Sequence, residues 1–588
     1  MPRKYRNEET VSRFRKKQKN GDIYVYEGRY RYDPESQKNK CLGTKLLGKI
    51  PKGATEMVPT RPKRPSKSAA QQKSENTPIE AERQCDTLDE ILEWAGQASG
   101  VDGDVAGAMH IGDAQKTISI ARYLLASGGQ PIPGIENWQI THTVPYADGL
   151  STDVCYRLFD VLGSDESARQ SFFYERAARL GNHPLIAFDS TTISTYSELL
   201  PEARFGFNKD NDGLKTIKYL VLYAVDTMEP IAYAEQPGNL PDVTSLTSAV
   251  AQLKFWGTSK PQVVMDKGFF SEENVMELCR NNMDFLVLGN LRSSWIKPHV
   301  EACLDTIKLP THLDDDPGTT TYVQTVKISH EFTYERKYAS SRKGLAAGAK
   351  ESFSRCLYLH VCYNPLSKEM EDTAFIQCVR SVMKDIQNGV MPEEMSDSGR
   401  RLAEKYLIIR RTRGGKIKSV EMDNDAIVEA CRYHGIFVIV ANHERNGFRA
   451  LHKYRRREKV EEFFKREKQD VDGNTPRVWY HSHLLGRMLV QFVALCYDDF
   501  LRRRIHIVRT YLDDVQSRGF PDQTAAQANL DKDLLKWLNK LSFHQILTWF
   551  DVYESIRVRT PMNRKRWDEA STRRDRRFLE LLKDMTLT

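Results

Sequence analysis

Residues 185–189 read LIAFD, and residues 263–266 read VVMD. Each is a short, nearly continuous run of apolar residues that ends in an aspartate. Such a run, without alternation between apolar and polar residues, is typical of a strand that is buried on both faces. The two runs therefore predict two central strands of an α/β core, and each strand is predicted to end in a carboxylate, Asp189 or Asp266.

Further strand-like runs surround this pair. Residues 219–225 and a run that starts at Ile231 follow the first aspartate, residues 285–288 follow the second, and residues 436–440 come after a long interval. Residues 242–255 are predicted to form a helix, because their first residue is an aspartate, a typical N-cap. An aspartate at a strand end can also serve only as a turn or a helix cap, so neither aspartate identifies a site by itself.

The run at 436–440 is followed by YRRREKVEEFFKREK at 454–468. Drawn as one continuous helix that advances about 100° per residue, this stretch places four polar side chains within roughly 60° of arc. They are Tyr454, Arg457, Glu461 and Lys468. A helix so rich in Arg, Lys and Glu is also what a solvated helix with ion pairs one turn apart looks like.

The spacing Tyr-x2-Arg-x3-Glu-x6-Lys resembles the Tyr/Arg/Glu/Lys signature of DDE transposases of the insertion-sequence-4 family, and all four positions match. The string MDKGFFSEEN at 265–274 is similar to the second catalytic motif of that family. The resemblance covers roughly residues 183–500. It implies an α/β, ribonuclease-H-like catalytic core that is interrupted by a strand-rich insertion domain.

The resemblance also implies the roles of six residues. The catalytic, metal-binding carboxylates would be Asp189, Asp266 and Glu461. The contacts to transposon-end DNA would be Tyr454, Arg457 and Lys468. Glu458 and Glu462 are close rivals of Glu461, and only the register of the signature selects among the three.

Three convergent carboxylates suit two Mg²⁺ ions, with Mn²⁺ as a substitute, because Mg²⁺ prefers hard oxygen ligands. One ion would activate the attacking water or 3′-hydroxyl, and the other would stabilise the leaving oxygen. The expected function is a DNA transposase that cleaves at the inverted-repeat ends of its insertion sequence and transfers the 3′ ends to target DNA. A structure-specific nuclease of the same fold and a non-catalytic DNA-binding protein derived from a transposase are the alternatives.

The expected partners are double-stranded DNA, as terminal inverted repeats and as target, and a second copy of the chain in a synaptic homodimer. Lys plus Arg exceeds Asp plus Glu by 8, and basic residues cluster at 61–67 and 564–577. The ten cysteines include no CxxC pair. No apolar run is long enough for a membrane span, since the best candidate, 484–501, is interrupted by charged residues, Asp498 and Asp499 among them. A cytoplasmic protein, nucleoid-associated when bound to DNA, is expected.

A chain of 588 residues is expected to form two to four domains. Composition and pattern, read together with the resemblance, predict seven segments. They are a small β module (1–50), a linker (51–83), a helical domain (84–181) whose position the resemblance matches to a DNA-end-binding region, the first part of the core (182–290), the insertion domain (291–435), the second part of the core (436–505), and a helical, basic C-terminal tail (506–588). Within the first segment, residues 22–33 alternate around Gly28 and are predicted to form a hairpin.

Overall fold

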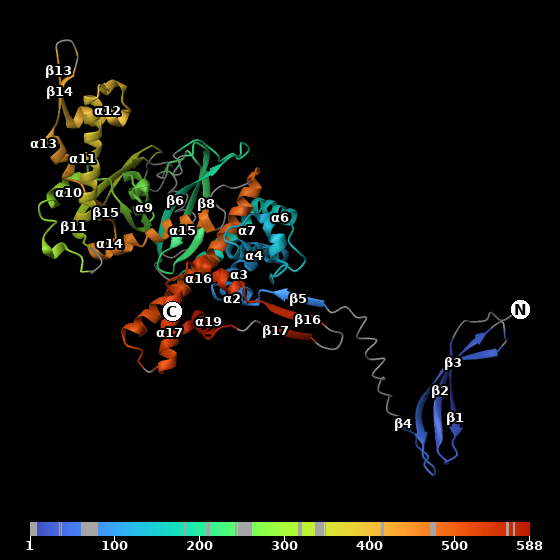
Figure 1. Ribbon diagram of the computed structural model, residues 1–588. Helices are drawn as coiled ribbons and strands as arrows, with labels where there is room; N and C mark the ends of the chain where they lie inside the picture. The colour runs from blue at the N-terminus through green and yellow to red at the C-terminus, as the bar shows by residue number, and fades with distance from the viewer. Residues whose placement is uncertain are drawn as a thin grey trace. The chain divides into compact units, whose positions relative to one another are not determined.

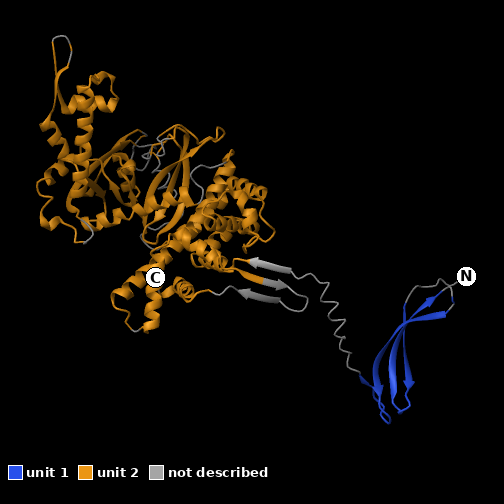
Figure 2. Ribbon diagram, in the orientation of Figure 1, with its two compact units in different colours: residues 1–81, 558–565 blue, residues 82–557, 566–588 orange. Residues whose placement is uncertain are grey.

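The computed structural model divides the chain into two compact units, residues 1–81 with 558–565 and residues 82–557 with 566–588 (Figure 2). The structure describes residues 9–33, 36, 38–59, 80–180, 184–206, 208, 212–241, 244, 261–315, 320–335, 346, 348–412, 415, 417–470, 478–521, 523–559, 564–568 and 571–587. Most of the predicted linker at 51–83 and of the predicted helix at 242–255 therefore lies outside the described residues.

The first unit is an antiparallel sheet of strand order β1-β2-β3-β4. Its strands are β1 (Thr10–Lys17), β2 (Ile23–Asp33), β3 (Lys38–Ile50) and β4 (Val58–Pro59). The predicted hairpin around Gly28 is wrong, because β2 runs straight through this glycine, which pairs with Ser12 on one side and Thr44 on the other. The alternation of side chains on both sides of Gly28 belongs to one long strand.

The second unit is a mixed α/β structure built around an eight-stranded sheet of order β11-β12-β15-β10-β9-β6-β7-β8 (Figure 1). Strand β9 pairs in parallel with both β6 and β10, and the remaining neighbours pair antiparallel. The strands are β6 (Leu185–Thr195), β7 (Lys215–Ala224), β8 (Glu229–Pro237), β9 (Gln262–Met265), β10 (Asp284–Leu288), β11 (Tyr322–Glu335), β12 (Lys350–Tyr363) and β15 (Ile436–Ala441).

The central strands have the predicted burial. All eleven residues of β6 and all four residues of β9 are buried. One detail of the prediction is wrong: Asp189 does not end its strand, because β6 continues to Thr195 and pairs with β7 along that whole length. The turn-like sequence Ser190, Thr191, Thr192 is strand, held by pairing with a partner that local sequence does not reveal.

Helices before β6 form the predicted mainly helical segment. They are α2 (Asp86–Ala98), α3 (Val101–Ala108), α4 (Ile111–Ala126), α5 (Ile135–Trp138), α6 (Thr152–Ser164) and α7 (Glu166–Ala178). Their buried side chains join those of the sheet in one continuous apolar core. This segment therefore packs as part of the second unit.

The long helix α16 (His481–Ser517) runs through this core. It approaches α6 so closely that glycines are required on both helices: a Cβ at Gly163 would lie 1.7 Å from the backbone oxygen of Ser482, and one at Gly486 would lie 2.0 Å from that of Phe159. Although α16 is long, no helix in the described part of the chain is apolar enough over a sufficient length to cross a membrane.

The predicted insertion at 291–435 divides into two parts. Strands β11 and β12 extend the main sheet through β15, so they do not belong to a separate strand-rich body. The remainder has its own small apolar core, which includes Val379 of α11 and Leu407 of β13. The elements of this small core are α11 (Pro365–Gln387), α12 (Asp397–Tyr406), β13 (Leu407–Arg411), β14 (Ile417–Met422) and α13 (Asn424–Cys431). Helix α10 (Lys297–Cys303) packs on the main core, and α9 (Glu272–Arg280) precedes the segment.

The end of the chain is packed rather than an exposed basic tail. Arg574 lies over the rings of Trp537 and Trp549, 4.7 and 5.1 Å from their centroids, and Arg577 pairs with the buried Asp531. Two strands, β16 (Ser555–Arg559) and β17 (Arg564–Asp568), lie within the segment 506–588, which was predicted to be helical. The other elements are α17 (Ala525–Leu538), α18 (Phe543–Asp551) and α19 (Arg573–Lys583), with β5 (Glu80–Gln84) earlier in the chain.

Candidate active site

Asp189 and Asp266 are brought together by the pairing of two strands. Phe188 of β6 and Met265 of β9 are partners in a parallel ladder, so the residues that follow them are neighbours in adjacent chain segments. Successive residues of a strand face opposite sides of the sheet. Phe188 and Met265 are both buried, whereas the side chain of Asp266 is 42% exposed and that of Asp189 is 11% exposed. Two carboxylates of different accessibility therefore lie side by side.

The predicted continuous helix at 454–468 is wrong. The chain forms α14 (Gly447–Arg455) and α15 (Glu458–Asp470), with a turn at residues 456–457. Tyr454 is the penultimate residue of the first helix, Arg457 lies in the turn, and Glu461 is in the first turn of the second helix. The side chains consequently meet through a bend in the chain rather than along one helical face.

Arg457 is the point at which the three predicted catalytic carboxylates converge. Its Nη1 donates to Oδ2 of Asp189 at 2.6 Å, and its Nη2 donates to Oε1 of Glu461 at 2.8 Å. The same Nη2 lies 4.0 Å from Oδ1 of Asp266. Burial by itself would lower the pKa of Arg457, but the carboxylates around it raise that pKa well above its usual value. The guanidinium is therefore a permanent cation among three acids.

Tyr454 completes the arrangement on the side of Asp266. Its hydroxyl donates to Oδ1 of Asp266 at 3.2 Å, and the guanidinium carbon of Arg457 lies 5.7 Å from the centre of its ring. Burial, with a further contribution from Asp266, raises the pKa of the phenol, so it stays protonated and can only donate to the carboxylate. Five of the six predicted site residues thus form one connected cluster.

The two rivals of Glu461 face solvent. Glu462 is exposed and pairs with Lys459 one turn earlier, at 3.1 Å, and Glu458 is exposed. Glu461 is itself 60% exposed and reaches the cluster through Arg457. Its position between a buried cation and solvent suits a ligand that must meet an incoming substrate.

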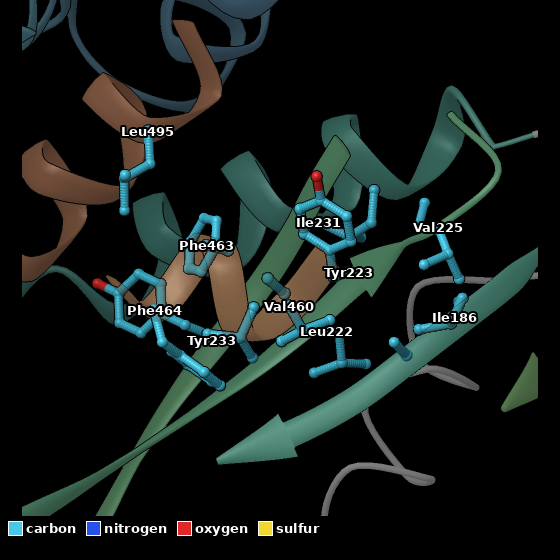
Figure 3. Close-up of a cluster of buried hydrophobic side chains, with 14 of the residues drawn as sticks. Ile186, Leu222, Tyr223, Val225, Ile231, Tyr233, Val460, Phe463, Phe464 and Leu495 are labelled. Carbon is cyan, nitrogen blue, oxygen red and sulfur yellow. The ribbon is translucent and has the colours of Figure 1, made fainter. Parts of the chain in front are cut away.

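Apolar packing fixes the helix that carries Glu461. Val460, Phe463 and Phe464 are buried beneath α15 (Figure 3). The rings of Phe463 and Tyr223 lie 5.8 Å apart, and those of Phe464 and Tyr219 lie 6.3 Å apart. Because both tyrosines belong to β7, the neighbour of β6, α15 is seated directly on the strands beside Asp189.

A buried ion-pair network also anchors α15. Nη1 of Arg466 lies 2.5 Å from Oδ2 of Asp498 and 2.6 Å from Oδ1 of Asp499, both on α16. Oδ1 of Asp499 also accepts a hydrogen bond from the hydroxyl of Tyr223 at 3.2 Å. In the sequence these two aspartates stand out only as interruptions of an apolar run. A buried acidic pair within an apolar helix is itself a signal for a basic partner.

Lys468, the sixth predicted residue, follows Glu461 by about two turns on α15 and is half-buried. Its charge lies close to the neighbouring Glu467, whose side chain is only 2% exposed. Burial raises the pKa of Glu467 to about 8, although Lys468 and Arg487 oppose that shift.

The donor set fits a divalent metal of the magnesium type. Three carboxylates, from β6, the end of β9 and α15, converge on one cation, and carboxylate oxygens are the ligands that Mg²⁺ prefers. Other possible ligand groups lie elsewhere among the described residues. They are Cys85 with His142 and Asp551, and Asp372 with Cys431 and His434. These groups contain nitrogen and sulfur donors and none of the three acids.

Comparison with known proteins finds a family match over part of the chain. Residues 180–294 match the protein-family model described as "Transposase DDE domain", a segment that contains Asp189 and Asp266. The match supports a transposase of the DDE class and, with it, the chemistry of DNA transposition and recombination. No curated protein matches the chain significantly.

Among solved structures, the chain is similar to one described as "Cryo-EM structure of piggyBac transposase synaptic complex with hairpin DNA (SNHP)". The identity is 9%, the alignment covers 79% of this chain and 78% of that one, and the TM-score is 0.33.

Proposed function

We propose that the protein is a DDE transposase of the insertion-sequence-4 type that cleaves DNA at the inverted-repeat ends of its element and transfers the 3′ ends to target DNA. The observation that carries the proposal is the convergence of Asp189, Asp266 and Glu461 on Arg457. The match of residues 180–294 to a transposase DDE domain supports it independently. The large mixed sheet, with Asp189 on β6 and Asp266 directly after the adjacent strand β9, supports a ribonuclease-H-like core.

The three carboxylates are the proposed ligands of two Mg²⁺ ions, with Mn²⁺ as a substitute. Bound there, the ions would supply activation of a water or 3′-hydroxyl and charge stabilisation at the leaving oxygen. The protein contributes orientation. Asp189 is fixed by a strand paired on both sides, and Glu461 by the packing of α15 and the anchor at Arg466.

Tyr454, Arg457 and Lys468 are the proposed contacts to the transposon end. The two Nη groups of Arg457 now bind carboxylates, and the same pair of donors has the geometry that binds a phosphate in a bidentate manner. A phosphate and a carboxylate are therefore alternative partners of one side chain. We further propose that two copies of the chain act together on the two ends of the element, and that the protein works in the cytoplasm, bound to the nucleoid.

The test uses the purified full-length protein and a labelled duplex that carries the inverted repeats flanking its gene. Wild type is expected to cut at the repeat boundary with Mg²⁺ or Mn²⁺ and to stop when EDTA is added. Repeat-specific binding without metal-dependent cutting would contradict the proposal and favour a non-catalytic DNA-binding protein. Cutting that is equally fast on a duplex without the repeats would contradict it in favour of a structure-specific nuclease.

A further inference from the structure

The excess positive charge of the protein is concentrated at its N-terminus. Residues 1–50 contain 14 Lys and Arg against 6 Asp and Glu, a net charge of +8, which equals the net charge of all 588 residues. The remaining 538 residues are therefore neutral in formal charge. A charge asymmetry of this size indicates a polyanionic partner for the first segment of the chain.

Strand register shows that this charge is segregated on one face of the sheet. Residues directly opposite each other in an antiparallel pair share a face, and residues two apart on one strand do so too. Arg13 is opposite Glu27, and Glu27 is opposite Lys45. The face that contains them, named here the basic face, carries eight of the ten cations in β1, β2 and β3. They are Arg13, Arg15, Lys17, Arg29, Arg31, Lys38, Lys40 and Lys45.

The opposite face has a different composition. It carries only two of the ten cations, Lys16 and Lys49, and most of the aromatic side chains. Phe14 stacks on Tyr26 across the strands, with ring centroids 5.5 Å apart. The division into a basic face and an aromatic face follows from the two-residue period of the strands and is not visible in the overall composition.

Few acids offset the charge of the basic face. Within the three strands these are Glu27, which lies 3.5 Å from Arg13, and Asp33. Just before β1, Glu9 pairs with Arg31 at 2.6 Å. All eight cations of the basic face are exposed. An exposed face with six more cations than acids in its strands attracts a densely charged anion.

We propose that the basic face of β1, β2 and β3 is a binding surface for duplex DNA, separate from the catalytic cluster and independent of metal. It would contact phosphates along the duplex, since positive charge spread over three strands matches a regularly charged backbone. The choice of DNA as the polyanion rests on the proposed function. The basic face would therefore be a second, non-catalytic DNA-binding site of the transposase.

The experiment compares two double variants of the full-length protein that remove the same charge from opposite faces. Arg15→Gln with Arg29→Gln alters the basic face, and Lys16→Gln with Lys49→Gln alters the aromatic face. Binding to a labelled duplex is measured in EDTA at several salt concentrations. The basic-face variant is expected to bind about tenfold more weakly at low salt, and its plot of log affinity against log salt is expected to be less steep by about 2. The aromatic-face variant is expected to bind like wild type.

Equal affinities for wild type and both variants, or equal losses in both variants, would overturn the proposal. Stronger competition by polyglutamate or by an RNA hairpin than by unlabelled duplex would overturn it as well, because the surface would then belong to another partner. Circular dichroism checks that each variant is folded. If the first basic-face variant is not folded, a second one, Arg13→Gln with Lys45→Gln, replaces it. If wild type shows no metal-dependent cleavage but the variants still differ in DNA affinity as expected, the result counts against the proposed function and not against the DNA-binding role of the basic face.

Discussion

Arg457 and Asp189 are 268 residues apart in the chain, yet Nη1 of the arginine lies 2.6 Å from Oδ2 of the aspartate. The contact joins the turn between α14 and α15 to the middle of β6. Each side chain is nearly buried, at 10% and 11% exposure. One ion pair therefore connects the helix that carries Glu461 to the strand that carries Asp189.

Replacing Arg457 is expected to destabilise the metal-free protein. Arg457→Gln would leave Asp189 buried beside Asp266 and Glu461 without a counter-charge, and breaking a buried ion pair by removing one partner costs about 3–5 kcal/mol. The measurement is the free energy of unfolding in urea with EDTA present. Lys459→Gln, which removes an exposed cation two residues further along the chain, in the first turn of α15, is the control and should cost less than about 1 kcal/mol.

Mg²⁺ should stabilise Arg457→Gln more than it stabilises wild type. Divalent cations and the guanidinium compete for the same carboxylates, so Mg²⁺ is expected to raise the melting temperature of Arg457→Gln by several degrees more than that of wild type. Equal shifts in the two proteins would show that the three acids do not hold the ion.

Asp104 is expected to be a major determinant of stability in the helices before the sheet. Its carboxylate is 1% exposed and lies 3.3 Å from Nη1 of the buried Arg176, and it also accepts from Arg179. Asp104→Asn should lower the free energy of unfolding by about 3–5 kcal/mol, because it leaves Arg176 without its charged partner. Asp113→Asn, which breaks the more exposed pair with Lys116, should cost less than about 1 kcal/mol. Similar losses of unfolding free energy in the two variants would contradict the assignment of Asp104 as a major determinant of stability.

Stability should fall as pH rises toward 8, because of Glu467. Its pKa is about 8 in the folded protein against 4.5 for the free group, mainly because of burial. Between these values the folded state binds more protons than the unfolded state, so the free energy of unfolding decreases with rising pH and levels off above about 8. Burial raises the pKa of Asp499 to about 6, which adds to the decline at lower pH.

Glu467→Gln isolates this contribution. The variant should lose most of the decline between pH 6 and pH 9 and should be more stable than wild type at pH 9, as measured by urea unfolding at each pH. Glu462→Gln, an exposed change on the same helix, should keep the wild-type profile. A steep decline that persists in Glu467→Gln would assign the effect to other groups.

The sequence predicted those parts of the site that depend on local pattern. Apolar runs ending in Asp189 and Asp266 identified two buried strands, because burial on both faces leaves a continuous apolar run. The break at residues 456–457 was not predictable in this way. No proline or glycine occurs between residues 448 and 470, so the bend follows from tertiary contacts such as that between Arg457 and Asp189.

Other differences between the predicted and the observed structure also come from pairing between segments that are far apart in the chain. Strands β11 and β12 join the main sheet through β15, a neighbour more than 70 residues later than β12, and no local feature marks that partner. The anchoring of α15 by Asp498 and Asp499 is similarly a contact between separate helices. Strand and helix positions were therefore more predictable than the partners of each element.

The most direct test of the account compares Glu461→Gln with Glu462→Gln, adjacent acids on α15 of which only the first contacts Arg457. The measurement is the single-turnover rate of cutting at the terminal repeat with Mg²⁺. Glu461→Gln is expected to slow cutting by at least about a thousandfold with DNA binding retained, and Glu462→Gln is expected to cut at nearly the wild-type rate. Cutting that survives Glu461→Gln, or that fails equally in both variants, would contradict the assignment of Asp189, Asp266 and Glu461 as the catalytic acids.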